Sequence, residues 1–323
     1  MKRRNFLLGA AAAGLLAACG RPTAAETSGG AWTFTDDRGR KVDLDHRPAR
    51  IVAQSGAAAA LWDLGVHAVG VFGPQKRKDG SNDPQVGAVD LAAVQSVGTT
   101  YGEFNVEKLA ALRPDLLVSG IYVPPALWYI TDDVKDRVDA LVKTVGISLH
   151  EKTAVDVIER YVQLGAALGA DPAAVSAAKA AFDAAAADLA AAAKAKPTLR
   201  IIAVSDSAQN FDVAVPAKYA DLSYYVKLGV PVTGPAKGVN SAYFEVMSWE
   251  QAAKYPADLI LYDARTQALP LDQLLTHPTF AGLPAVKAGQ IAPWHAETPF
   301  SYQRYTPVIK ELTAAVAKAE PLG

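Results

Sequence analysis

The chain has 323 residues, a formal net charge of −1 and a single cysteine, and half of its residues are hydrophobic. The near-neutral charge argues against a nucleic acid as partner, because binding to phosphates needs an excess of basic residues. One cysteine allows no internal disulfide, so packing alone must stabilise the fold.

The first residues have the pattern of a bacterial export signal. Lys2, Arg3 and Arg4 precede an apolar run over residues 6–18, which is shorter than the roughly 20 residues of a membrane-spanning helix. We therefore expect residues 1–18 to be a signal peptide. The pair Arg3-Arg4 resembles a twin-arginine signal, with the general export route as the alternative. Loss of this segment removes three basic residues and no acidic one, so the net charge changes from −1 to −4.

The only cysteine follows this apolar run directly. Leu16-Ala17-Ala18-Cys19 resembles the lipobox of bacterial lipoproteins, whose cysteine becomes the acylated first residue. Cys19 is therefore the predicted lipidation site, and an inert buried thiol is the alternative. Several acyl chains anchor a protein stably to a membrane surface, which a single chain does not. Residues 19–30 are then a flexible, lipidated tether on the outer face of the cell membrane.

Strand and helix patterns alternate through the body of the chain, which is long enough for two domains. This alternation predicts mainly parallel sheets covered by helices. The predicted elements are strands at residues 32–35 (leading into a hairpin turn at 36–39), 50–53, 68–71, 116–118, 199–204, 259–262 and 290–292, and a helix at 57–64.

Residues 152–196 divide the chain into two halves. Apolar residues recur at steps of three and four over residues 153–169, which predicts an amphipathic helix about 25 Å long. Such a helix can cross from one lobe to another, although a helical layer inside one large domain is the alternative. A second, Ala-rich helix is predicted to begin after its N-cap residue Asp171 and to end before Pro197.

A short motif occurs once on each side of this helical region. Residues 105–118 and residues 248–261 both contain an N-cap residue, a Glu two positions later, a short helix, a Pro-containing turn and a buried strand. The repeat indicates two lobes of similar build. The predicted fold is therefore α/β, with Rossmann-like lobes at residues 31–151 and 171–323. One long rigid helix at 152–170 joins them, and the ligand cleft lies between them.

The export signal, the early strand at residues 50–53 and the motif at residues 105–118 together resemble the periplasmic iron-siderophore and cobalamin binding proteins. These are the substrate-binding components of ABC importers, and the resemblance runs from about Trp32 to the C-terminus. It implies two lobes bridged by a long helix, with the ligand in a shallow cleft between them. It also implies a membrane-tethered monomer that delivers its ligand to an ABC permease and its ATPase subunits.

Glu107 and Glu250, the glutamates of the two motif copies, match the positions at which family members dock onto arginines of the permease. Acids on separate lobes would set both the spacing and the orientation of docking. The alternative is that each carboxylate only opposes the dipole of its own helix, which is worth about 0.3–1 kcal/mol.

The ligand cleft should be built from loops at the strand ends. Aromatic rings there can lie against a greasy chelate, and Arg can donate to the oxygens around Fe(III). A core position is the alternative for each aromatic residue, and a solvated charge is the alternative for Arg77. The predicted ligand-binding residues are Arg77, Tyr101, Tyr122, Trp128, Phe211, Tyr224, Tyr243, Arg265, Trp294 and Tyr302.

The expected ligand is an Fe(III)-siderophore complex, and no resident cofactor is expected. Hydroxamates are favoured over catecholates, because a strongly anionic tris-catecholate complex needs more basic residues than these loops contain. Haem, with Tyr101 or His295 as axial ligand, and cobalamin are the alternatives within the same family. A directly bound metal ion is not expected, since the five histidines are scattered along the chain.

An enzyme is disfavoured because the sequence motifs of common enzyme classes are missing. The chain contains no Gly-x-Ser-x-Gly elbow, no P-loop and no Gly-x-Gly-x-x-Gly after a strand. A surface-anchored hydrolase is the remote alternative to a binding protein.

Overall fold

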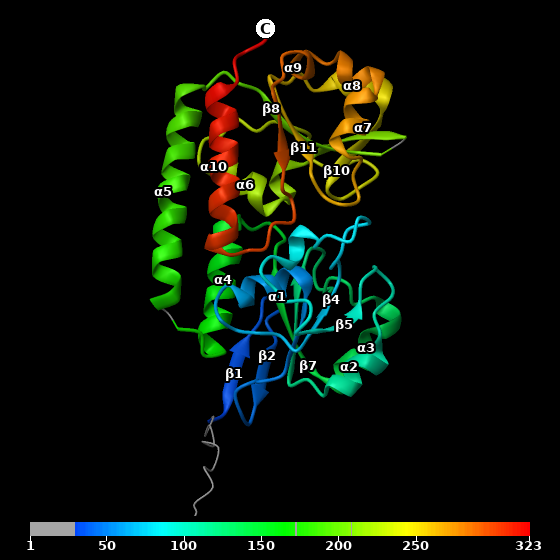
Figure 1. Cartoon of the computed structure of the whole chain (residues 1–323), viewed down its shortest axis with the longest axis vertical. Helices are drawn as coiled ribbons and strands as arrows, with labels where there is room; N and C mark the ends of the chain where they lie inside the picture. Colours follow the sequence, from blue (N-terminus) through cyan, green and yellow to red (C-terminus); the bar gives the residue numbers. More distant parts are fainter. Residues whose placement is uncertain (1–29, 172, 208) are drawn as a thin grey trace, which may run out of the picture.

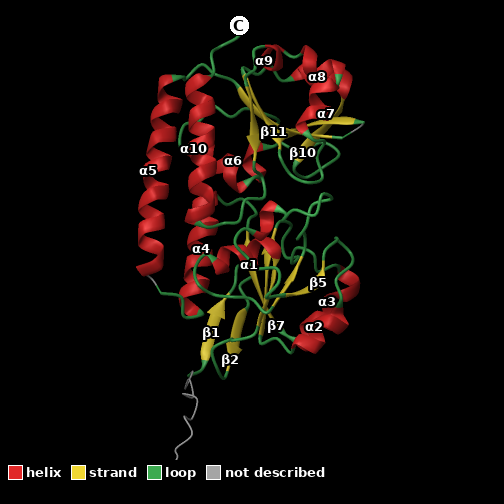
Figure 2. Ribbon diagram, viewed as in Figure 1, coloured by secondary structure: helices red, strands yellow, loops and turns green. Residues whose placement is uncertain are grey.

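A computed structural model of the chain describes residues 30–171, 173–207 and 209–323, which form two lobes that each contain a five-stranded sheet (Figures 1 and 2). The predicted signal peptide, Cys19 and all but the last residue of the predicted tether lie outside the described residues. Within the described residues, no helix combines the length and the apolar character that a membrane span requires.

The lower lobe in Figure 1 opens with the predicted hairpin and continues into an all-parallel sheet of order β5-β4-β3-β6-β7. Its strands are β1 (Trp32–Thr35), β2 (Lys41–Leu44), β3 (Ile51–Gln54), β4 (Gly70–Phe72), β5 (Gln95–Gly98), β6 (Leu116–Ile121) and β7 (Lys143–Ser148). Its helices are α1 (Ser55–Trp62), η1 (Pro84–Val86), α2 (Val106–Leu112) and α3 (Asp132–Leu141).

The upper lobe contains a mixed sheet of order β10-β9-β8-β11-β12, in which β8, β11 and β12 are parallel and β9 is antiparallel to both of its neighbours, β8 and β10. Its strands are β8 (Ile201–Asp206), β9 (Asn210–Ala214), β10 (Phe244–Ser248), β11 (Leu259–Asp263) and β12 (Ile291–Trp294). Its helices are η2 (Pro216–Lys218), α6 (Ala220–Lys227), η3 (Trp249–Lys254), α7 (Leu271–Thr276), α8 (Pro278–Gly282), α9 (Pro284–Lys287) and α10 (Tyr302–Lys318).

The two lobes share a hydrogen-bonding feature in addition to the sequence motif. In the lower lobe, the Asp115 carboxylate accepts from the backbone N–H of Arg50 at 2.8 Å, just before β6 and β3 begin. In the upper lobe, the Asp258 carboxylate accepts from the backbone N–H of Arg200 at the same distance, just before β11 and β8 begin. Each aspartate thus ties together the starts of two neighbouring parallel strands, which supports the prediction of two lobes of similar build.

Two helices, α4 (Ala154–Ala167) and α5 (Ala173–Ala195), connect the lobes. Thr153 and Asp156 form a reciprocal capping box that begins α4, close to the predicted start of this helix at residue 153. Helix α4 contacts α1 and β7 of the lower lobe and α6 of the upper lobe. Helix α5 packs along α10 and extends from beside the lower lobe to the top of the upper lobe (Figure 1).

Helices cover both faces of each sheet (Figure 2). On the side of α4, α5 and α10, one apolar cluster runs through both lobes and includes Ile51 and Leu116 below and Ile201 and Leu259 above. Alternate strand residues such as Val52 face separate clusters on the opposite side, one in each lobe. The shared cluster means that packed side chains join the lobes along one side, in addition to the chain connections.

Candidate ligand-binding site

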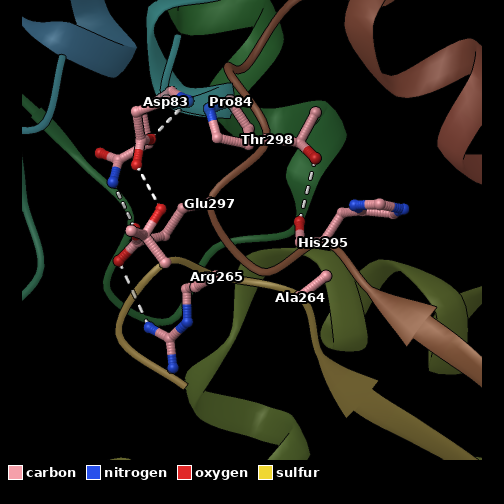
Figure 3. A pocket seen from close by; sticks show the side chains of 9 residues that line it. Asp83, Pro84, Ala264, Arg265, His295, Glu297 and Thr298 are labelled. Carbon is pink, nitrogen blue, oxygen red and sulfur yellow. Dashed lines mark hydrogen bonds and ion pairs between the residues drawn. The ribbon is translucent and has the colours of Figure 1, made fainter. Parts of the chain in front are cut away.

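A small hollow, partly open to solvent, lies between the two lobes and offers about 30 Å³ to the centre of a water-sized molecule (Figure 3). The lower lobe contributes the start of η1, and the upper lobe contributes the loops that follow β11 and β12. Parallel strands end at this level in both lobes, which is where open α/β sheets bind ligands. The lining residues are Asp83, Pro84, Gln85, Ala264, Arg265, Thr266, His295, Glu297 and Thr298.

Arg265 and Glu297 occupy the floor of the hollow. Arg265 donates to both oxygens of the fully buried Asp263 carboxylate at 2.6–3.0 Å, and its Nη1 lies 3.3 Å from Glu297 Oε1. The other Glu297 oxygen accepts from Gln85 Nε2 of the lower lobe at 2.5 Å. Burial raises the pKa of the Glu297 carboxyl; Arg265 opposes the rise, and the charge of Asp263 adds to it.

Asp83 makes the second polar bridge between the lobes. Its Oδ1 accepts from the backbone N–H of Gln85 and so caps η1. Its Oδ2 accepts from Thr266 Oγ1 of the upper lobe at 2.6 Å. The side chain is 4% exposed, so this carboxylate is held in place by contacts from both lobes.

Aromatic side chains of the lower lobe form a group beside the hollow. Trp128 lies at its centre, with ring centroids 5.3 Å from Tyr101, 4.9 Å from Tyr122 and 5.8 Å from Tyr129. Tyr243 of the upper lobe closes one end, because its hydroxyl donates to the backbone oxygen of Tyr122 at 2.5 Å. The structure thus brings together four of the predicted ligand-binding residues, Tyr101, Tyr122, Trp128 and Tyr243.

Tyr129 belongs to the same group, although the sequence analysis did not select it. Its φ of 68° lies in the left-handed region, which is an outlier for a bulky residue and is typical of functional sites. Burial raises the pKa of the Tyr129 hydroxyl to about 12, and the charges of Glu297 and Asp83 add to the rise. A charge shifts a pKa mainly at short range, so the Tyr129 hydroxyl lies near Glu297 and Asp83. The aromatic group therefore adjoins the polar hollow.

Four other predicted ligand-binding residues do not lie in loops, and this placement corrects the prediction. Phe211 and Trp294 are on strands β9 and β12, and Tyr224 and Tyr302 are on helices α6 and α10. Their exposed fractions are 0%, 2%, 7% and 2%, in that order. Burying a large aromatic ring removes much apolar surface from water, so such rings usually lie in the core.

Each of these four rings packs among other core rings. Phe211 packs against Trp249, with ring centroids 5.4 Å apart. Tyr224 and Tyr302 both pack against Phe182 of α5. The Trp294 indole donates to Asp221 at 2.7 Å and lies beneath Arg265, so it supports the floor of the hollow from below.

Arg77 lies in the loop between β4 and η1, as predicted. Its Nε is buried, and no acceptor among the described residues pairs with it. The residue as a whole is only half-buried, so its role in ligand binding stays a prediction.

The family profile described as "Periplasmic binding protein" matches residues 51–298, about three quarters of the chain. The chain belongs to this family. The predicted resemblance is thereby confirmed. A comparison with curated proteins found no match.

Solved structures of other binding proteins resemble this periplasmic binding protein over most of its length. DesE, a ferric-siderophore receptor protein from Streptomyces coelicolor, is 41% identical with a TM-score of 0.86, over 90% of this chain and 100% of DesE. A siderophore periplasmic binding protein from the fuscachelin gene cluster of Thermobifida fusca is 21% identical with a TM-score of 0.61, over 83% of this chain and 96% of that one. The petrobactin-binding protein YclQ from Bacillus subtilis is 15% identical with a TM-score of 0.69, over 89% and 99%. The last two similarities concern the fold alone.

The two predicted docking glutamates of this periplasmic binding protein lie on different lobes. Glu107 is in the first turn of α2 in the lower lobe, and Glu250 is in the first turn of η3, which directly follows β10 in the upper lobe (Figure 1). Both are exposed. Glu107 also forms an ion pair with Arg137 of α3 at 2.5 Å, a contact that the sequence analysis did not predict.

Several residues of the hollow were missed because they are polar rather than aromatic. Asp83, Gln85, Thr266, Glu297 and Thr298 all lie in or beside loops that follow strands. Glu297 lies five residues after the predicted strand at 290–292, so a search for carboxylates after strand ends could have found it, whereas Asp83 lies too far along its loop. Among the described residues, no group of three or more His, Cys, Asp or Glu side chains is arranged to hold a metal ion.

Proposed function

We propose that this periplasmic binding protein captures a ferric siderophore between its lobes and delivers it to an ABC permease. The similarity to DesE carries the proposal, because 41% identity over the whole of a ferric-siderophore receptor exceeds what a shared fold alone requires. The interlobe hollow and the aromatic group beside it supply a suitable place for the chelate. The proposal involves binding without a catalytic step.

Hydroxamate siderophores fit the charges of the hollow better than catecholates do. Arg265 is the only arginine or lysine among the lining residues, and Asp263 already neutralises it. Asp83 and Glu297 would repel a strongly anionic tris-catecholate complex. A ferric tris-hydroxamate centre is formally neutral and meets no such repulsion.

Titration of tryptophan fluorescence tests the proposed ligand class. The titrants are ferrioxamine, ferric enterobactin, haem and cobalamin, and Trp128 is placed to report on a ligand in the cleft. We expect saturable quenching by ferrioxamine and weaker or no quenching by ferric enterobactin. Saturable quenching by haem or cobalamin alone would overturn the siderophore assignment.

We also propose that Glu107 and Glu250 dock onto arginines of the permease. The permease arginine would replace Arg137 as the partner of Glu107, while Glu250 is free of ion pairs among the described residues. Because the two glutamates lie on different lobes, only a correctly oriented protein could engage both.

A double variant tests this docking. Glu107→Ala combined with Glu250→Ala should abolish siderophore uptake by cells and leave the affinity for the ligand unchanged. A matched control removes two exposed acids from the helical side, with Glu159→Ala and Asp188→Ala, and should transport normally. Normal uptake by the docking variant would contradict the proposed role.

The proposed topology places the protein outside the cell. Residues 1–18 would be an export signal, and Cys19 would anchor residues 19–30 as a tether to the outer face of the membrane. The lobes at 31–151 and 171–323, bridged by 152–170, would act as a monomer. Cys19→Ser should release the protein from the membrane fraction into the surrounding medium; retention of the variant on membranes would contradict lipidation at this residue.

A further inference from the structure

The charges around the hollow do not balance. Three carboxylates, Asp83, Asp263 and Glu297, face one guanidinium, that of Arg265, which gives a formal charge of −2. The ring of His295, the remaining titratable lining residue, points away from the others (Figure 3) and pairs with Glu311 at 2.8 Å.

Arg265 interacts more closely with Asp263 than with Glu297. It makes three contacts of 2.6–3.0 Å with Asp263 and a single contact of 3.3 Å with Glu297. Asp83 has no cationic partner among the described residues and accepts only from a hydroxyl and a backbone N–H. Buried carboxylates without a full counter-charge are unfavourable, and a cation entering the hollow would relieve that cost.

Aromatic rings lead from the outer aromatic group to this hollow. Tyr243 lies 6.4 Å from Tyr122 and 5.4 Å from Tyr219, and Tyr219 lies 4.6 Å from Trp294. Trp294 in turn lies beneath Arg265, 5.8 Å from its guanidinium carbon. Because Arg265 already covers the buried Trp294 ring, this ring holds the guanidinium in place beside the carboxylates, which remain the groups that face a ligand.

The size of the hollow limits what can enter it. The centre of a water-sized molecule can occupy only about 30 Å³ of it, which is room for about two waters. This space suits a small terminal group such as an ammonium and excludes the whole ferric complex. The chelate itself would then lie farther out, against Tyr101 and Trp128, of which Tyr101 is 56% exposed.

We propose that the hollow receives a pendant primary ammonium group of a ferric hydroxamate, and that Asp83 and Glu297 are the residues that select for it. This inference rests on the proposed function and specifies the ligand further. The ammonium group would donate to the two carboxylates, and the neutral iron centre would remain among the aromatic rings.

A matched pair of ligands isolates the ammonium group. Ferrioxamine B carries a pendant primary ammonium, and its N-acetyl derivative has the same iron centre without the charge. Fluorescence titration of the wild-type protein should give an affinity about tenfold or more higher for ferrioxamine B, the lower range of what a buried charge pair contributes at an interface. Equal affinities would overturn this inference alone. Binding of neither compound would overturn the proposed function as well.

Two variants test the assigned residues. Asp83→Asn and Glu297→Gln should each reduce the preference for ferrioxamine B, measured as the ratio of the affinities for ferrioxamine B and its N-acetyl derivative in the same variant. Asp188→Asn, which removes one exposed acid on α5, is the matched control and should keep the preference. Binding of the N-acetyl derivative verifies that each variant is folded. A preference that persists in both variants would contradict the assignment.

Discussion

The two lobes have similar central strands but differ at one edge of their sheets. Each starts with an aspartate that ties together two parallel strands, Asp115 with β3 and β6 and Asp258 with β8 and β11. The lower lobe continues with parallel strands only, whereas the upper lobe adds the antiparallel pair β9 and β10. The central strands are therefore alike in the two lobes, and the edges of the sheets are not.

The lobes also differ in how they use aromatic residues. Tyr101 and Trp128 of the lower lobe lie in loops beside the hollow, and Tyr101 is more than half exposed. Phe211 and Trp294 of the upper lobe lie on strands in the core. The comparison shows that these lower-lobe rings lie at the surface beside the hollow, whereas these upper-lobe rings are used for packing in the core.

The largest expected effect is on the core of the upper lobe. Phe211→Ala removes a ring with no exposed surface and should lower the free energy of unfolding by about 3–5 kcal/mol, through lost burial and a residual cavity. Denaturant unfolding measures the loss. Tyr101→Ala, its counterpart in the lower lobe, should change stability by less than about 0.5 kcal/mol. Similar losses in both variants would remove the distinction between the lobes.

A smaller effect concerns a buried acid of the upper lobe. Asp206 is 5% exposed, and burial raises the pKa of its carboxyl from 3.8 to about 6, although a hydrogen bond from the backbone N–H of Leu269 opposes the rise. Since the folded-state pKa exceeds the unfolded one, stability is highest below pH 4 for this group and falls as pH rises through about 6.

Asp206→Asn removes this titration and preserves an oxygen that can accept from Leu269. At pH 7.5 the variant should be more stable than the wild type by about 2 kcal/mol, and the difference should vanish near pH 4. Denaturant unfolding at the two pH values measures both quantities. A stability difference independent of pH would show that Asp206 is not the titrating group.

The smallest expected effect is on ligand binding by the lower lobe. Trp128→Ala removes the ring that contacts Tyr101, Tyr122 and Tyr129, and should weaken ferrioxamine binding roughly tenfold, or about 1.4 kcal/mol. Calorimetry measures the affinity without relying on tryptophan fluorescence. Tyr224→Phe in the upper lobe, which retains the core ring, is the control and should bind as the wild type does. Unchanged affinity in Trp128→Ala would place the ligand elsewhere.

Local patterns in the sequence predicted most of the fold. Period-two and period-three-to-four patterns, with caps such as Asn105, predicted the hairpin, the central strands of both sheets and the connecting helices. These features depend on nearby residues, so one sequence suffices to find them. The antiparallel edge of the upper sheet was not predicted, because strand direction depends on which distant strands pair.

The site was predicted only in part. The aromatic loop residues of the lower lobe were found because loops near strand ends are marked by Gly, Pro and polar residues. In the upper lobe the same reasoning selected Tyr224 and Tyr302, but both rings pack against Phe182 of α5 in the core. A sequence shows that a ring lies near a loop, but only the packing of distant helices decides whether solvent reaches it.

The sequence by itself determined two similar α/β halves and a helical connection between them, because these follow from local periodicity and a repeated motif. The family was indicated by the resemblance of residues 105–118 and the export signal to known family members. Only the tertiary structure decided that Asp83 and Gln85 of one lobe meet Thr266 and Glu297 of the other. These residues are about 200 positions apart in the chain, with separations of 183 and 212. No local pattern encodes such a contact, since the packing of both lobes against shared helices is what brings the two sheet edges together.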